Sequence, residues 1–213
     1  MPFAENTELI HPLTEHVLRV ALTQSASWER LGLRLDMAIN ASTRNLHDLH
    51  FPTMVAELLA EAGVSARTLE VEITENTVMA DPVRSTTVLA ELRAQGVRIA
   101  VDDFGTGYSS LAHLRDLTVD SVKIDKSFIT DMSRNRSDRA ITQAIVDLAR
   151  NLDVVTVAEG IETTDAWDAL KVLGCGYGQG YLIARPLPAA EMTAWVQALP
   201  CGAWQPETQD ERL

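Results

Sequence analysis

The sequence predicts an α/β fold built around a parallel β-sheet, and two observations support this prediction. Six short segments rich in Val, Ile and Leu recur along the chain, and each is followed by a stretch with the apolar spacing of a helix. Several of these segments are almost continuously apolar, as expected for strands that are covered on both faces. Successive strand–helix units of this kind form a parallel sheet with helical crossovers.

The predicted strands occupy residues 33–40, 69–75, 97–103, 121–125, 154–159 and 177–183. Helices are predicted at residues 12–31, 52–62, 81–95, 137–152, 164–173 and 188–199. The helix at 81–95 has recognisable limits, because Asp81 and Pro82 form a favourable N-cap and first turn and Gly96 is a favourable stop. We expect one domain over residues 1–200, followed by a polar tail over 201–213.

The composition is that of a globular protein and excludes several classes. With 18 Lys and Arg against 30 Asp and Glu, the net charge is −12, which argues against a protein that binds duplex nucleic acid. No segment reaches the roughly 20 apolar residues of a membrane helix, and the first residues lack the pattern of a secretory signal. Cys175 and Cys201 are the only cysteines, so a disulfide framework is excluded and a cytoplasmic location is expected.

Two architectures compete for such a chain: an open, doubly wound sheet and a barrel. The phosphate-binding pattern G-x-G-x-x-G, typical of the open fold after its first strand, is absent. A (β/α)₈ TIM-like barrel needs eight units and typically about 250 residues. This chain offers six units and starts with a helix that no strand precedes, which favours a barrel whose first part is missing.

Polar residues at the strand ends also favour the barrel. They are Asn40, Glu72, Asp102, Asp103, Lys123, Asp125, Glu159 and Gln179. In a barrel the carboxyl ends of all strands meet at one rim, where side chains from different strands converge. In an open sheet the outer strands would hold their side chains too far apart. A single acid at a strand end is usually a helix cap or a solvated residue, but here six consecutive strands carry such residues.

Acids that converge without matching bases repel one another, and divalent cations such as Mg²⁺ or Mn²⁺ relieve that repulsion. Neighbours on a regular strand point to opposite faces, so Asp102 and Asp103 reach one site only where the strand ends and twists. Such a pair could hold two ions in the arrangement used for displacement at phosphorus. Lys123 would add positive charge for a phosphate or orient a water.

Specific motifs lie at these strand ends: Asn40-Ala41-Ser42, Glu72-Ile73-Thr74-Glu75, Asp102-Asp103-Phe104-Gly105-Thr106-Gly107-Tyr108-Ser109-Ser110, Lys123-Ile124-Asp125, Ala158-Glu159-Gly160-Ile161-Glu162 and Gln179-Gly180-Tyr181. With them the chain resembles the EAL family of cyclic di-GMP phosphodiesterases over essentially its whole length. The resemblance implies a modified (β/α)₈ barrel of the EAL type. It also implies hydrolysis of one 3′–5′ bond of this bacterial second messenger, which gives linear pGpG.

The resemblance further implies roles for individual residues. The metal ligands would be Asn40, Glu72, Asp102, Asp103 and Glu159, with Asp102 bridging two Mg²⁺ or Mn²⁺ ions. Lys123 would position or deprotonate the attacking water, with Asp125 beside it. Glu75 would anchor the loop that contains Phe104, Gly105, Thr106, Gly107, Tyr108 and Ser109, which in this family couples dimerisation to metal binding. Gln179 and Glu162 would lie near the substrate. The implied partners are cyclic di-GMP, a second copy of the chain, and an upstream sensor or GGDEF-type domain.

One departure from the family is that its Glu-Ala-Leu motif does not occur here. The residues Met1-Pro2-Phe3-Ala4-Glu5 align with the segment shortly after that motif. We therefore expect the first two strands to be absent, together with one glutamate ligand and the substrate-binding arginine that follows it. Loss of a carboxylate ligand should weaken the metal site, so this chain alone should be poorly active. The strands at 33–40 and 177–183 should be left as unpaired edges.

Two other functions stay open. A catalytically inactive, EAL-like module that binds cyclic di-GMP or dimerises would keep the barrel without turnover. Every other metal ligand is present, however, and this favours descent from an active enzyme. A different metal-dependent barrel, such as an aldolase or an enolase-like enzyme, would need a base for carbon acids, which nothing in the motifs suggests.

Overall fold

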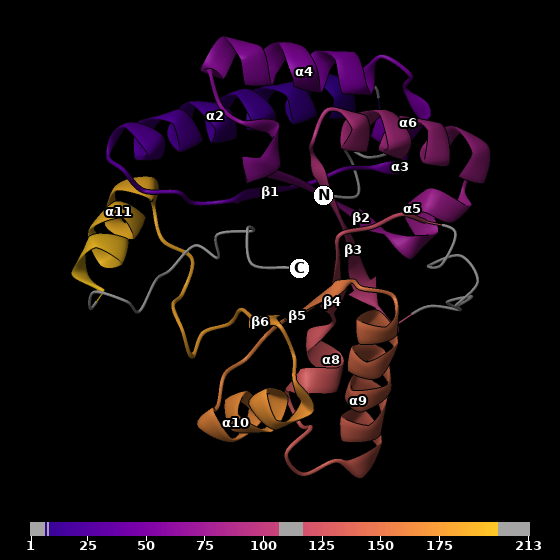
Figure 1. The fold of residues 1–213 in the computed structure, drawn as a ribbon, viewed down its shortest axis with the longest axis vertical. Coiled ribbons are helices and arrows are strands. Elements are labelled where there is room, and N and C mark those ends of the chain that lie inside the picture. Colours follow the sequence, from indigo (N-terminus) through magenta and orange to yellow (C-terminus); the bar gives the residue numbers. More distant parts are fainter. Residues whose placement is uncertain (1–6, 8, 107–116, 200–213) are drawn as a thin grey trace.

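In a computed structural model of the chain, which describes residues 7, 9–106 and 117–199, six parallel strands form one sheet in the order of the sequence. They are β1 (Met37–Asn40), β2 (Leu69–Thr74), β3 (Arg98–Phe104), β4 (Ser121–Ile124), β5 (Val155–Ala158) and β6 (Tyr177–Gly178). Within the described residues β1 pairs only with β2 and β6 only with β5, so the sheet is an open part of a barrel (Figure 1). The predicted parallel α/β fold with six strands is confirmed.

In the part of the chain that the structure describes, six helices of ten residues or more cover the sheet: α2 (Ile10–Arg30), α4 (Phe51–Ala62), α6 (Pro82–Ala94), α9 (Arg136–Asn151), α10 (Thr164–Leu173) and α11 (Ala189–Ala198). Each lies close to a predicted helix. Three short helices follow strands directly and were not predicted, namely α3 (Thr43–His47), α5 (Glu75–Met79) and α8 (Lys126–Ile129), and a 3₁₀ turn spans Ala66–Thr68. Ser42, Thr74 and Asp125 cap the short helices with their side-chain oxygens, so each strand passes straight into a capped turn.

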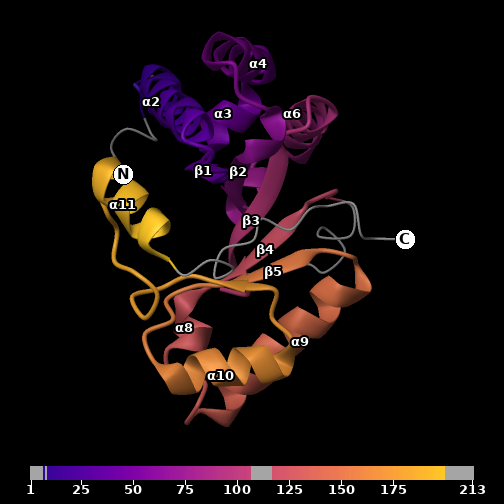
Figure 2. The same cartoon turned by 60° about the vertical axis from the view of Figure 1, so that its left-hand side comes forward.

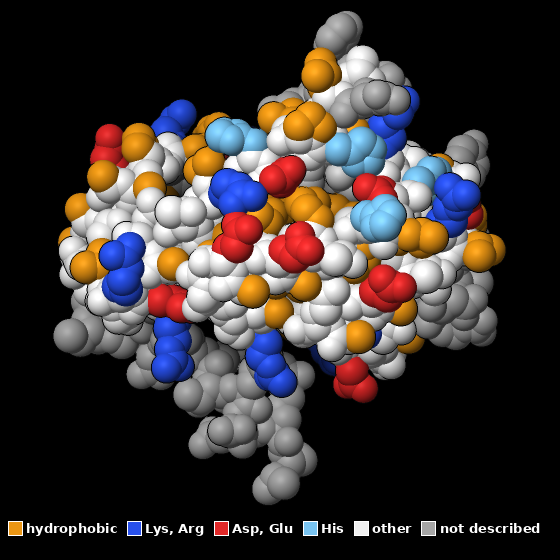
Figure 3. All heavy atoms as spheres, turned by 90° about the horizontal axis from the view of Figure 1, so that it is seen from above, with side chains coloured by type: hydrophobic (Ala, Val, Ile, Leu, Met, Phe, Trp, Pro, Cys, Tyr) orange, Lys and Arg blue, Asp and Glu red, His pale blue; other side chains and the backbone are white. Residues whose placement is uncertain are grey.

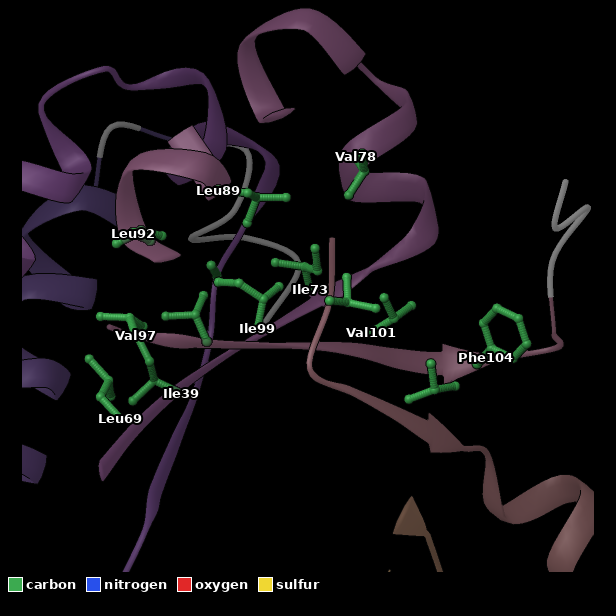
Figure 4. Packing of buried hydrophobic residues seen from close by; sticks show 14 of the residues in the cluster. Ile39, Leu69, Ile73, Val78, Leu89, Leu92, Val97, Ile99, Val101 and Phe104 are labelled. Carbon is green, nitrogen blue, oxygen red and sulfur yellow. The ribbon is translucent and has the colours of Figure 1, made fainter. Parts of the chain in front are cut away.

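The two faces of the sheet differ in chemistry because side chains alternate along each strand. The face toward the helices is apolar: Ile39, Leu69, Ile73, Ile99 and Val101 are buried there, and Leu89 and Leu92 of α6 pack beside them (Figure 4). On β2, β3 and β4 the intervening positions face the barrel interior and, apart from Ala100, carry polar side chains: Glu70 and Glu72 on β2, Arg98 and Asp102 on β3, and Ser121 and Lys123 on β4.

A second, smaller cluster connects the C-terminal helix to the start of the sheet. Trp28, Leu35 and Val196 are buried together, and Nε1 of Trp28 donates a hydrogen bond to Oγ1 of Thr193 at 2.7 Å. The chain that follows β6 therefore runs back to the β1 end of the sheet, where α11 lies beside α2 (Figure 2).

The surface over α2 and α4 carries charges of both signs together with histidines, without a continuous basic area (Figure 3). Among the described residues, no helix is both long and apolar enough to cross a membrane.

The first and the last strand are much shorter than the sequence suggests. The first begins at Met37 instead of residue 33, because Leu33 is hydrogen-bonded to the end of α2 (N to the Trp28 O, 2.9 Å) and Leu35 packs in the second cluster. The last covers only Tyr177–Gly178 instead of 177–183. Beyond Gln179 the chain turns, with the Ile183 N donating to the Gly180 O at 3.0 Å. The predicted tail at 201–213 lies outside the described residues.

Gly180 fixes this turn against the loop that follows β5. The Leu182 N donates to the Ile161 O at 2.9 Å, and a Cβ added at Gly180 would collide with the backbone N and O of Ile161. We predict that Gly180→Ala lowers the free energy of unfolding by about 3 kcal/mol, because backbone atoms cannot move aside as a flexible side chain can. Urea denaturation measures this.

The control is Gly63→Ala, at a position with φ +68° and nothing within 4 Å of an added Cβ. Backbone strain alone should cost about 1 kcal/mol there. Equal losses for both variants would show that the Gly180–Ile161 contact does not constrain the turn.

Candidate active site

The carboxyl ends of four strands meet around the side chain of Lys123. Its Nζ lies 2.7 Å from Oε1 of Glu159, 2.8 Å from Oε1 of Glu72 and 3.4 Å from Oδ1 of Asp102. Only 8% of the Lys123 side chain is exposed. Since Glu72, Asp102 and Lys123 lie near the carboxyl ends of β2, β3 and β4 and Glu159 follows β5, the structure brings together side chains from four neighbouring strands.

The irregular end of β3 lets two consecutive acids approach this cluster. The pairing of β3 with β4 shifts between Val101 and Phe104, and Asp103 has a left-handed backbone with φ 52°. The Asp103 N donates to Oδ1 of Asp102 at 3.0 Å. As a result, carboxylate oxygens of Asp102, Asp103 and Glu159 all lie within 4.8 Å of one another. The irregular backbone expected near the end of this strand is therefore present, and it lets both Asp102 and Asp103 face one site.

Burial and charge act in opposite directions on this cluster. Burial raises the pKa of Glu72 and of Glu159, although the Lys123 ammonium opposes the shift. Burial also acts against the charged form of Lys123, but hydrogen bonds to Glu159 and Glu72 outweigh it and raise the Lys123 pKa, so this side chain stays protonated. At Asp103, burial and the neighbouring Asp102 charge raise the pKa.

This donor set fits a divalent cation. One ammonium faces three carboxylates and Asp103 adds a fourth, so the cluster carries excess negative charge. Oxygen donors of this kind are the ligands that Mg²⁺ and Mn²⁺ prefer. The residues that could hold such an ion are Glu72, Asp102, Asp103 and Glu159.

The other predicted site residues occupy the same rim at different depths. Gln179 joins the cluster directly, because its Nε2 donates to Oε1 of Glu159 at 2.6 Å. Asn40 ends β1 in register with Glu72 and is exposed. Asp125 caps α8 by accepting from the Ser127 N at 2.9 Å; burial opposes its charge, but hydrogen bonds from Ser127 outweigh burial and lower its pKa. Glu162 is exposed on the loop after Glu159.

The predicted loop after β3 is described only in part. Phe104 is buried, and Gly105 has φ +94° with α8 and α9 close by, since an added Cβ would lie 3.1 Å from Phe128 and 3.2 Å from Ile145. Thr106 donates through Oγ1 to the Asp103 O at 2.8 Å. Gly107, Tyr108 and Ser109 lie outside the described residues. Glu75 is half-buried at the first position of α5, and its predicted role as anchor of the loop stays a prediction.

The sequence interpretation missed a second polar layer beneath the cluster. Glu70 accepts from Oγ of Ser121 at 3.2 Å, and Nε of Arg98 lies 4.0 Å from Oε2 of Glu70. Nη2 of Arg98 lies 2.7 Å from Oδ2 of Asp36. Counting back two residues from Glu72 and four from Asp102 would have found Glu70 and Arg98, because positions two apart share a face of a strand.

Comparison with known proteins agrees with these motifs. The family model that matches the chain is described as the EAL domain and covers residues 1–186. A Pseudomonas aeruginosa protein named as a cyclic di-GMP phosphodiesterase is 40% identical over 197 residues, which are 92% of this chain and 34% of that protein. The chain spans about a quarter to a third of the length of the curated relatives it matches.

Solved structures show the same fold. A structure of the PaMucR phosphodiesterase in complex with c-di-GMP has a TM-score of 0.85 and 39% identity, covering 90% of this chain and 78% of that one. A manganese and c-di-GMP complex of BlrP1 from Klebsiella pneumoniae has a TM-score of 0.76 and 30% identity, covering 82% of this chain and 44% of that one. Because the family model matches most of its residues, the chain belongs to the EAL domain family.

Proposed function

We propose that this chain catalyses the metal-dependent hydrolysis of cyclic di-GMP to linear pGpG. The observation that carries the proposal is the meeting of four acids and Lys123 at one rim of the sheet. Relatives named as cyclic di-GMP phosphodiesterases, and the PaMucR phosphodiesterase solved with c-di-GMP, support the substrate. The alternative of an inactive binding module has less support, because all five ligand candidates named from the motifs are present.

In this proposal Asn40, Glu72, Asp102, Asp103 and Glu159 would hold Mg²⁺ or Mn²⁺. A bound divalent ion would neutralise phosphate oxygens and lower the pKa of a water. The manganese and calcium complexes of BlrP1 with cy-diGMP support this assignment. Gln179 restrains Glu159 through its 2.6 Å hydrogen bond, and so helps to set the direction of that carboxylate.

Lys123 acts in this proposal by positioning a water. In the metal-free chain its raised pKa keeps this side chain an ammonium, which has no lone pair to receive a proton. Asp125 lies two residues further on, at the start of α8, where it adds negative charge near Asp103. Glu162 and Gln179 would contact the substrate from the ends of β5 and β6.

The proposal extends to assembly and to activity. We propose that two copies associate, with Glu75 and the loop after β3 coupling their contact to the metal site. We also propose a sensor or GGDEF-type domain in the same protein, since a relative from Pseudomonas aeruginosa is named as a bifunctional diguanylate cyclase and phosphodiesterase. The sequence has no Glu-Ala-Leu motif, so turnover by these 213 residues alone should be slower than with that glutamate supplied.

The direct test is product formation with Mn²⁺. Cyclic di-GMP incubated with the chain and Mn²⁺ should give pGpG by chromatography. The Asp102→Asn variant should lower the rate by about a hundredfold or more, because it removes a shared carboxylate ligand. The matched control is Asp147→Asn, which changes an exposed aspartate on α9. Equal rates for Asp102→Asn and the unchanged chain would refute the assignment of the site.

The buried acids also predict how the metal-free chain responds to pH. Burial raises the pKa of Glu72 and Glu159 above their ordinary value of 4.5, so the fold binds these protons more tightly than the unfolded chain does. Their contribution to stability is complete below that ordinary value and is lost as the pH rises through the raised values. With metal removed by EDTA, the free energy of unfolding should therefore fall as the pH rises above the ordinary value of 4.5 and through the raised values.

Urea titrations of Glu159→Gln check this, because the glutamine has no proton to lose. Its unfolding free energy should fall less steeply over the same interval. Glu57→Gln, at an exposed position on α4, should keep the original slope. A Glu159→Gln variant with an unchanged slope would contradict the account.

A further inference from the structure

The rim of the site carries a second lysine, Lys126, which forms no ion pair with any residue that the structure describes. Lys126 is the first residue of α8, three positions after Lys123 and directly after Asp125. It is one of three lysines in the sequence, the others being Lys123 and Lys171.

The stem of Lys126 lies against the residue that follows Glu159. A Cβ added at Gly160 would lie 2.5 Å from the Lys126 Cβ and 3.5 Å from its Cα, and Gly160 has φ +68°. Glycine at this position therefore leaves the space in which the lysine stem sits. This contact holds Lys126 between the ends of β4 and β5, beside the loop that supplies Glu159.

The three lysines differ in how their charges are neutralised. Lys123 contacts three carboxylates, and Nζ of Lys171 lies 2.8 Å from Oδ1 of Asp168. Lys126 is exposed and forms no ion pair with any described residue, although its charge lowers the pKa of Asp125. An exposed ammonium on a four-carbon stem is free to turn toward an anion that enters the site.

We propose that Lys126 binds the phosphate of cyclic di-GMP that is not hydrolysed. This inference rests on the proposed function. The substrate carries two anionic phosphates, of which only one can lie at the Glu72–Asp102–Glu159 cluster. The other would have to be held elsewhere on a rim whose strand ends also carry the acids Asp103, Asp125 and Glu162, so it would need a cation to offset their repulsion. Lys126 supplies that cation.

The kinetic test uses Lys126→Met, which keeps an apolar stem against Gly160 and removes only the charge. We expect KM for cyclic di-GMP to rise about tenfold with a smaller change in kcat, since the contact holds a non-reacting group. Lys126→Arg keeps the positive charge and should keep KM near its original value. Lys171→Met is the matched control and should leave KM unchanged. An unchanged KM in Lys126→Met would overturn the proposal.

A second readout is independent of turnover. Lysine acetylation is followed by mass spectrometry with and without cyclic di-GMP, in Ca²⁺, the ion of another BlrP1 complex. Cyclic di-GMP should slow the labelling of Lys126 several-fold and leave Lys171 unchanged. Equal labelling of Lys126 in both conditions would overturn the proposal whatever the kinetics show. If the unchanged chain makes no pGpG, the proposed function fails, and the labelling still decides whether Lys126 binds cyclic di-GMP.

Discussion

The buried ammonium of Lys123 is the interaction on which the site depends. A charge with 8% of its side chain exposed is stable only when partners compensate for the water it has lost, and three carboxylates from three neighbouring segments do so. Conversely, these carboxylates approach one another only because the ammonium lies between them. This mutual stabilisation determines how far the carboxylates of Glu72, Asp102 and Glu159 are buried. It also leaves a surplus of negative charge for a cation to neutralise.

The sheet makes this arrangement possible by separating its two faces. Apolar side chains on the helix-facing side bury the strands, and this burial is the main source of stability for a domain of this type. The opposite side is then free to carry charge, from the Glu70–Arg98 layer up to the Lys123 cluster. At the far end of the sheet, Gly180 packs on Ile161 and so places Gln179 next to Glu159. The packing of Gly180 on Ile161 therefore also determines where a side chain of the site lies.

Most of the fold and the convergence of the site residues followed from two periodicities. Alternating and continuous apolar runs located the six strands, and polar residues at their ends located the rim. The strand predicted at 177–183 was too long. Its apolar residues are typical of a strand, whereas the turn depends on contact between Gly180 and Ile161, which are distant in sequence. The short capped helices after β1, β2 and β4 were missed because four or five residues give too little periodicity. Lys126 was overlooked because its position depends on Gly160, which belongs to another strand–helix unit.

The central claim is that the carboxylates around Lys123 form a cation site. Mn²⁺ titration followed by electron paramagnetic resonance of the free ion measures this without any substrate. The account predicts saturable binding to the chain, weakened about tenfold or more by Glu159→Gln and unchanged by Glu91→Gln on the exposed side of α6. Mn²⁺ binding that is absent, or that is the same in both variants, would contradict it.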